Sequence, residues 1–289
     1  MRLALLTALT MMAFAANSIL NRMAVGSGDI DAISFAVIRV MSGAAVLLVL
    51  ALIQRRKLPL LAPGRIVGAL SLCLYLLGFS IAYIRLDAGL GALILFGCVQ
   101  ITMFSGAVIG GEPVPRGRWF GAGIALAGLG WLVWPAGAVQ VPVLGSLFMA
   151  LAGVGWGLYS LAGRKSGDPL AATAANFLWA APVCFLLPML LPVQLDATPM
   201  ALRGIGLACV SGALTSGLGY ALWYAVLPKL ETAVAGLVQL TVPVIAILGG
   251  VLLLDESVSL RLIAAAAVVL GGIAFGLMTP QRKMGSSGS

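Results

Sequence analysis

The chain has 289 residues, of which 61% are hydrophobic and 9% are charged, and its net charge is +8. A protein with so few charges cannot keep its surface in water, so the composition excludes a water-soluble fold. Since one crossing of a bilayer takes roughly 20 apolar residues, the successive apolar runs predict an all-α integral membrane protein.

Ten apolar runs follow one another, and no polar stretch between them is long enough for a soluble domain. The first run is too long, and lacks the small-residue cleavage site, for a removed signal peptide. Residues 284–289 resemble a cloning remnant and are set aside. In chain order, the predicted transmembrane helices are residues 3–23, 32–53, 66–84, 89–109, 119–139, 143–162, 170–191, 204–227, 233–254 and 260–278.

The positions of the cations predict the orientation, because Lys and Arg in short loops are retained on the cytoplasmic side. With the N-terminus inside, twelve of the 17 cations fall in inner segments, and Arg39 lies within the second predicted helix. The outer segments hold Arg22, Arg85, Arg203 and Arg261. We therefore expect a multi-pass protein with both termini in the cytoplasm. We attribute its positive net charge to the orientation of the helices in the membrane rather than to nucleic-acid binding.

The sequence also repeats itself at a shift of 144 residues. At this shift Arg85–Asp87 falls on Lys229–Glu231, and Glu112 falls on Glu256, each acid closing an apolar run. Because each half has an odd number of helices, the second copy must enter the membrane from the other side, as in many secondary transporters. The expected fold is therefore ten transmembrane helices in two inverted five-helix repeats, residues 1–140 and 141–283.

No catalytic constellation can be assembled from this sequence. It contains no histidine, which excludes a Ser-His-Asp triad, and its nine acids all fall at predicted helix ends or in loops. An intramembrane aspartyl protease would need two mid-membrane aspartates, and a zinc site would need a cluster of ligands. We expect no enzyme, no catalytic residue, no metal and no cofactor.

Arg39 is the one clear charge inside a predicted helix. It lies about eight residues into the second run, hence roughly 12 Å from the outer end of that helix. A charge at that depth must face the interior of the bundle or a wet cavity. Two roles stay open: a cross-link to groups of neighbouring helices, or a docking point for a substrate carboxylate.

Polar and aromatic residues at helical spacing indicate where a pathway would run. Phe14, Asn17 and Asn21 share one face of the first helix, where the amides could bind a substrate or hold helices together. Aromatic and amide groups elsewhere are candidates for a cavity wall, with ordinary packing as the alternative. These candidates are Tyr75, Phe79, Gln100, Trp156, Tyr159, Tyr220 and Gln239.

The ninth predicted helix contains a proline and a pair of glycines. Pro243, together with Gly249 and Gly250, is a candidate for local bending of this helix when the protein changes conformation. Close helix packing is the competing account.

These features together resemble the drug/metabolite transporter superfamily, specifically its EamA-type ten-helix exporters, and among those the YddG-like aromatic amino acid exporters. In the fourth helix the proline expected from the resemblance is absent, and Val99 and Gln100 stand there instead. The matching residues are Phe14, Asn17, Asn21, Arg22, Arg39 and the run from Ala233 through Pro243, Gly249 and Gly250 to Glu256.

The resemblance implies a bacterial inner-membrane exporter of amino acids, with aromatic and other apolar ones favoured, that works by alternating access. Because no histidine or mid-membrane acid is present, we expect facilitated transport rather than coupling through a buried carboxylate. The expected partners are a small-molecule substrate and the lipid bilayer. A monomer is compatible with the sequence, which leaves the oligomeric state open. The alternatives are a broad-specificity drug or metabolite exporter and a non-transporting membrane scaffold or receptor.

Overall fold

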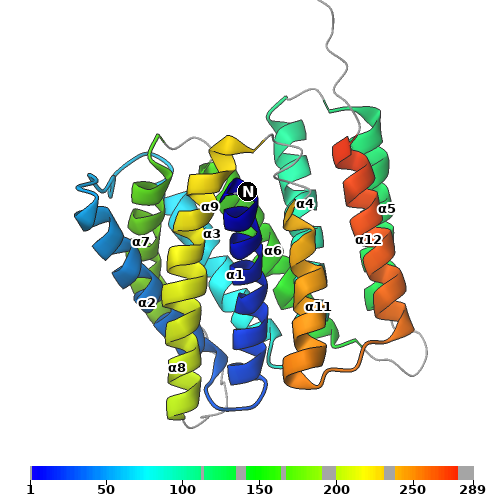
Figure 1. Cartoon of the computed structure of the whole chain (residues 1–289), viewed down its shortest axis with the longest axis horizontal. Coiled ribbons are helices and arrows are strands. Elements are labelled where there is room, and N and C mark those ends of the chain that lie inside the picture. Colours follow the sequence, from blue (N-terminus) through cyan, green and yellow to red (C-terminus); the bar gives the residue numbers. More distant parts are fainter. Residues whose placement is uncertain are drawn as a thin grey trace, which may run out of the picture.

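The computed structural model describes residues 2–111, 114–134, 141–163, 167–190, 200–230 and 238–278, and every regular element among them is helical (Figure 1). The elements are α1 (Arg2–Val25), α2 (Ala32–Ile53), α3 (Arg65–Ala82), α4 (Ala88–Ile109), α5 (Arg116–Val133), α6 (Val143–Gly163), α7 (Pro169–Leu190), α8 (Leu202–Val210), η1 (Ser211–Leu218), α9 (Gly219–Val226), η2 (Leu227–Lys229), α11 (Thr241–Leu254) and α12 (Leu260–Met278).

These elements form ten rods, because α8, the π-helix η1 and α9 follow one another without a break. We call this eighth rod the α8–η1–α9 rod. Eight of the ten rods are long and apolar enough to cross a membrane, and α11 is apolar but shorter within the described residues. The expected all-α membrane fold is therefore confirmed.

The predicted helix bounds agree with the observed ones within a few residues, except at the fifth and ninth helices. The fifth helix was expected at 119–139 but begins at Arg116 and ends at Val133, and residues 135–139 lie outside the described residues. The first turn of this helix carries two arginines. A prediction from the extent of an apolar run does not include such charged residues. Residues 233–237 of the predicted ninth helix, and residues 284–289, lie outside the described residues.

Local sequence explains how the second helix of each half begins. Asp31 precedes α2, and its carboxylate accepts a hydrogen bond from the Ser34 amide at 2.8 Å. Asp168 precedes α7 and accepts from the Ala171 amide at 3.2 Å. Such caps satisfy amides that have no partner inside the helix. The same device thus starts α2 and α7, which are the corresponding helices of the two halves.

The helix contacts also come in matched sets. In the first half, α1 packs on the α8–η1–α9 rod and on α11, and in the second half α6 packs on α3 and on α4. Likewise, α2 packs on η1 as α7 packs on α3. Corresponding helices of the two halves also contact each other, in the pairs α2–α7, α4–α11 and α5–α12. Exchanging the two halves maps this set of contacts onto itself, as an inverted repeat requires.

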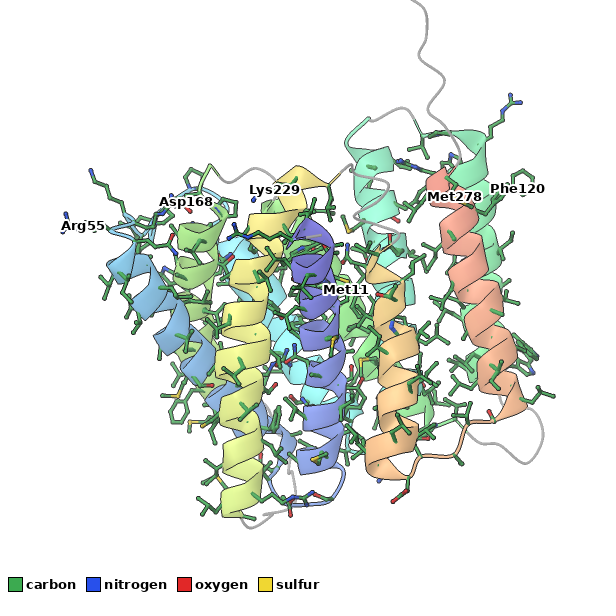
Figure 2. The ribbon with its side chains drawn as sticks, viewed as in Figure 1. Met11, Arg55, Phe120, Asp168, Lys229 and Met278 are labelled. Carbon is green, nitrogen blue, oxygen red and sulfur yellow. The ribbon has the colours of Figure 1, made fainter. Side chains whose placement is uncertain are left out.

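Both ends of the described chain lie on one side of the bundle. Arg55, Asp168, Lys229 and Met278 lie at the end that carries the N-terminus (Figure 2). We call this the N-terminal end and the other the far end. The arrangement agrees with an even number of crossings.

Glycines allow α5 and α12 to pack closely at one edge of the bundle (Figure 1). A methyl group at Gly121 would lie 2.4 Å from the carbonyl oxygen of Gly272 and 2.9 Å from the Cα of Gly276. These atoms belong to the backbone, so they cannot rotate away. At Gly123, on the same helix, an added methyl group would meet no atom within 4 Å.

We predict that Gly121→Ala destabilises the protein by about 1–3 kcal/mol, because α5 and α12 must move apart to admit the methyl group. Gly123→Ala is the matched control and should leave stability unchanged or slightly raised, since alanine favours the helix. Thermal unfolding in detergent, followed by size-exclusion chromatography, measures both. Equal unfolding temperatures for the two variants would contradict the prediction.

Candidate substrate cavity

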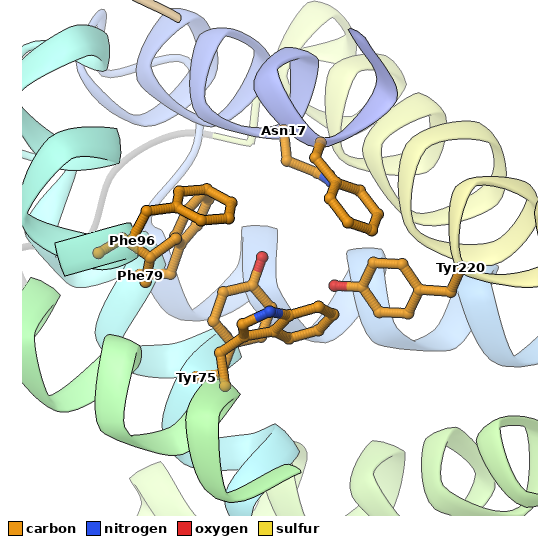
Figure 3. A pocket seen from close by; sticks show the side chains of 8 residues that line it. Asn17, Tyr75, Phe79, Phe96 and Tyr220 are labelled. Carbon is orange, nitrogen blue, oxygen red and sulfur yellow. The ribbon is translucent and has the colours of Figure 1, made fainter. Parts of the chain in front are cut away.

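A small cavity lies at the centre of the bundle, where helices of both halves meet. Figure 3 shows side chains that approach it from different helices, with Tyr75 entering from below and Tyr220 from the right. The free space is about 10 Å³, which is room for roughly one water molecule. The cavity is therefore closed around its own side chains. It is lined by Phe14, Asn17, Tyr75, Phe79, Leu95, Phe96, Trp156 and Tyr220.

Aromatic rings make up most of this wall. The ring of Trp156 lies 5.0 Å from that of Tyr75 and 4.9 Å from that of Tyr220, measured between centroids. Phe14 meets the rings of Trp156 and Tyr220 edge-on, at 6.0 and 5.7 Å. Tilted and edge-on contacts are the arrangements that aromatic pairs prefer. The cavity thus offers ring faces and edges to an apolar group.

Arg39 lies beside this wall and has no exposed surface. Its Nη2 donates a hydrogen bond to the Tyr75 hydroxyl at 2.8 Å, and its Nε donates to the Ser216 hydroxyl at 3.0 Å. The guanidinium carbon lies 5.2 Å from the Tyr75 ring centroid and 5.0 Å from that of Phe79. Such cation–π contacts stabilise a desolvated arginine. Arg39 therefore links α2 to α3 and to the α8–η1–α9 rod.

Asn17 connects α1 to the same network through the π-helix. Its amide oxygen accepts hydrogen bonds from the hydroxyls of Ser211 at 2.9 Å, Thr215 at 2.5 Å and Ser216 at 3.3 Å. Ser216 therefore bridges Asn17 and Arg39. π-Helical turns are frequent at functional sites. Sequence reasoning missed η1, although the hydroxyl residues between two glycines were a signal of close polar packing.

The structure brings six of the predicted site residues to the cavity wall. Asn21 lies off the wall and donates to the Ser80 hydroxyl at 2.8 Å. Tyr159 packs its ring 5.5 Å from that of Trp156 but does not line the space. Gln100 and Gln239 are partly buried and also off the wall, so their role stays a prediction. The six residues on the wall are Phe14, Asn17, Tyr75, Phe79, Trp156 and Tyr220.

Two wall residues were not predicted from the sequence. Leu95 and Phe96 come from α4, a helix of 22 residues with no strong apolar face. Because every face of such a helix is apolar, the sequence cannot indicate which residues turn inward.

The residues predicted to bend the ninth helix lie in its contacts with neighbours. Pro243 is buried in the first turn of α11. Amides in the first turn have no partner inside the helix, so the amide proton that proline lacks costs no helix hydrogen bond. A methyl group at Gly249 would lie 2.2 Å from Cδ1 of Ile19 on α1. Close packing of α1 on α11 thus accounts for Gly249. Bending of the helix at Pro243, Gly249 and Gly250 stays a prediction.

Charged residues join three helices at the far end of the bundle. Arg22 of α1 pairs with Asp87 at 3.4 Å and with Glu256, in the α11–α12 turn, at 3.5 Å. Both carboxylate oxygens of Glu256 accept from the Ala88 amide, at 2.9 and 3.0 Å, at the start of α4. A carboxylate at a helix N-terminus is a favourable position. We call Arg22, Asp87 and Glu256 the far-end cluster.

Comparisons with known proteins agree with this architecture. The model of the EamA-like transporter family matches residues 143–278. An uncharacterized protein of Pseudomonas aeruginosa is 48% identical over 273 residues, which cover 94% of this chain and 93% of that protein. A Salmonella typhimurium protein named "Probable amino-acid metabolite efflux pump" is 28% identical over 201 residues, which cover 65% of this chain and 67% of that protein.

A solved crystal structure superposes on this fold with a TM-score of 0.61 and 20% sequence identity, covering 93% of this chain and 96% of the other. At that identity the likeness concerns the fold. The family match covers the second half of the chain, and the fold match extends over both halves. Residues 143–278 therefore form an EamA-like transporter domain of the drug/metabolite transporter type, in a chain whose fold is that of a multi-pass membrane protein.

Proposed function

We propose that this protein exports amino acids with aromatic or other large apolar side chains across the bacterial inner membrane. The observation that carries this proposal is the closed cavity at the centre of the bundle, with its aromatic wall and a few amide and hydroxyl groups. Ring faces suit an apolar side chain, and the polar groups suit the charged end of an amino acid. The name of the Salmonella relative, which concerns amino-acid metabolites, supports the same substrate class.

The volume of the cavity requires the helices to move during transport. Room for about one water molecule cannot hold an amino acid, so the cavity must open to admit one. Two inverted halves, residues 1–140 and 141–283, provide two equivalent ways of opening, one toward each side of the membrane. Alternating access is therefore the mechanism we propose.

The far-end cluster is the proposed closure on the outer side. The excess of cations in the predicted inner loops assigns the N-terminal end, with both termini, to the cytoplasm. The far end then faces outward. The cluster ties the end of α1 to the start of α4, two helices that line the cavity, and to the end of α11, so these ion pairs would break when the far end opens.

We propose that the transport is facilitated. The chain has no histidine, and each acid among the described residues lies before or after a helix. The cavity wall itself is formed by neutral side chains. Among the described residues, no carboxylate lies on the cavity wall or within a helix, where it could carry protons through the centre of the membrane.

Counterflow in proteoliposomes tests the function directly. We predict that labelled phenylalanine exchanges against unlabelled phenylalanine without a pH gradient, and that Trp156→Ala lowers this exchange by about 10-fold, because it removes the central ring of the wall. Trp119→Ala is the matched control, since Trp119 is 54% exposed on α5 and should leave exchange unchanged.

Absence of counterflow with every amino acid would contradict the proposal and favour a non-transporting scaffold or receptor. Proton movement in fixed ratio to the substrate would contradict facilitated transport. Equal exchange in the Trp156 and Trp119 variants would remove Trp156 from the site.

The far-end cluster should respond to pH through Glu256. Burial raises the pKa of the Glu256 carboxyl above its usual range, and Asp87 adds to this, while the Ala88 amide and Arg22 act in the opposite direction. The structure shown here therefore binds this proton more tightly than an unfolded or opened form does. The bound proton contributes its full stabilisation of this structure at pH values below the usual carboxyl pKa. This contribution is lost as the pH rises through the raised pKa of Glu256.

We predict that wild-type protein gains thermal stability relative to Glu256→Gln as pH falls through this window, because the variant has no proton to bind. Asp255→Asn is the matched control: it removes the neighbouring exposed carboxylate, and asparagine suits the left-handed backbone there, with φ of 53°. Unfolding temperatures measured from about pH 4 to 8 decide the question. A pH-independent or reversed difference between wild type and Glu256→Gln would contradict it.

A further inference from the structure

We infer that the cavity recognises its substrate by the carboxylate and has no charged group for the ammonium. Carboxylates with an apolar side chain but no amino group should then bind as well as the amino acids themselves. This inference rests on the proposed function for the choice of the cavity as the binding site. It names the group of the substrate that the site requires.

The first observation is a buried positive charge that no acid neutralises. Arg39 has no exposed surface, and its hydrogen bonds go to the neutral hydroxyls of Ser216 and Tyr75. None of the four ion pairs among the described residues involves it. Its Nη1 is buried and has no hydrogen-bond partner in the described structure. A buried cation in this state attracts an anion strongly.

The second observation is the absence of an anionic group that would favour an ammonium. The acids among the described residues all lie before or after helices, away from the cavity wall: Asp29, Asp31, Asp87, Asp168, Asp255 and Glu256. Ring faces would attract an ammonium, but the Arg39 guanidinium already lies over the Tyr75 and Phe79 rings, and its like charge opposes a second cation there. The electrostatics of the described site therefore favour a negative charge.

Two hydroxyls connect the cavity to this charge. The Tyr75 hydroxyl lines the cavity and accepts from Arg39, so its own proton is available to a substrate. The Tyr220 side chain also lines the cavity and is buried, and its hydroxyl interacts with Tyr75 and with Arg39. In Figure 3 the Tyr220 side chain enters this space from the right and the Tyr75 side chain enters it from below.

A carboxylate placed between the two hydroxyls could accept from both and would lie close to the guanidinium group behind Tyr75. Charge-assisted hydrogen bonds of this kind are about twice as strong as neutral ones. An ammonium at the same place could donate to the hydroxyl oxygens, but it would meet the like charge of Arg39. The arrangement thus separates carboxylates from amines by chemistry rather than by size.

Four small probes of similar shape test this inference on the purified full-length protein in detergent. L-phenylalanine has both groups, 3-phenylpropionate has only the carboxylate, phenethylamine has only the amine, and L-phenylalaninamide replaces the carboxylate by a neutral amide. We expect the two carboxylates to raise the unfolding temperature with apparent affinities within about 3-fold of each other. The two amines should bind at least about 10-fold more weakly.

A tyrosine variant locates the effect. Tyr220→Phe removes one hydroxyl and keeps the ring that packs on Trp156 and Phe14, so the fold should be retained. It should weaken binding of both carboxylates by about 10-fold and leave binding of phenethylamine unchanged. Tyr83→Phe is the control for loss of a buried hydroxyl away from the cavity, because Tyr83 is equally buried, donates to the Ala88 carbonyl at 3.2 Å and lies off the cavity wall.

Each outcome decides one claim. Phenethylamine or phenylalaninamide binding as tightly as 3-phenylpropionate would overturn the inference, and so would the absence of stabilisation by either carboxylate. Equal effects of Tyr220→Phe on carboxylates and amines would overturn the role of the hydroxyl. Binding of 3-phenylpropionate without counterflow of any amino acid would instead refute the proposed function and leave the inference standing.

Discussion

A charged side chain with no contact to water or lipid constrains the centre of this protein. Arg39 lies on α2, whose other residues are mostly apolar, and a charge at the centre of a membrane helix costs about 2.5–3.5 kcal/mol on insertion scales. The helix must therefore turn this residue toward the bundle. Tyr75 of α3 and Ser216 of the α8–η1–α9 rod satisfy it, and Ser216 brings in Asn17 of α1. One buried charge thus holds four rods around the cavity.

On the outside of the bundle, in contrast, apolar side chains are exposed. Large apolar side chains such as Ile109 and Leu202 are 87% and 85% exposed, as expected where lipid replaces water. Polar groups consequently gather at the centre and at the two ends. The arrangement of helices is similar in both halves, since the contact of α1 with α11 matches that of α6 with α4. The family model itself matches residues 143–278, in the second half.

Much of the fold could be predicted from the sequence, because a membrane helix needs a long apolar run; the prediction for 32–53 agrees with α2 residue for residue. Asn17 and Arg39 could be placed at the centre because polar residues within such a run must avoid lipid. The π-helix η1 could not be predicted, since its geometry depends on contacts with α1 and α2 rather than on its own residues. Arg22 and Glu256 stood out in the sequence, but their pairing at 3.5 Å depends on tertiary packing.

The central claim is that the closed cavity opens alternately to the two sides of the membrane. The most direct measurement places a single cysteine at Phe79, on the cavity wall, after Cys73, Cys98, Cys184 and Cys209 have been replaced. A membrane-impermeant thiol reagent is then applied to right-side-out and to inverted vesicles. Alternating access predicts labelling from both sides, slowed in both by phenylalanine. Protection of this cysteine from both sides would contradict the account.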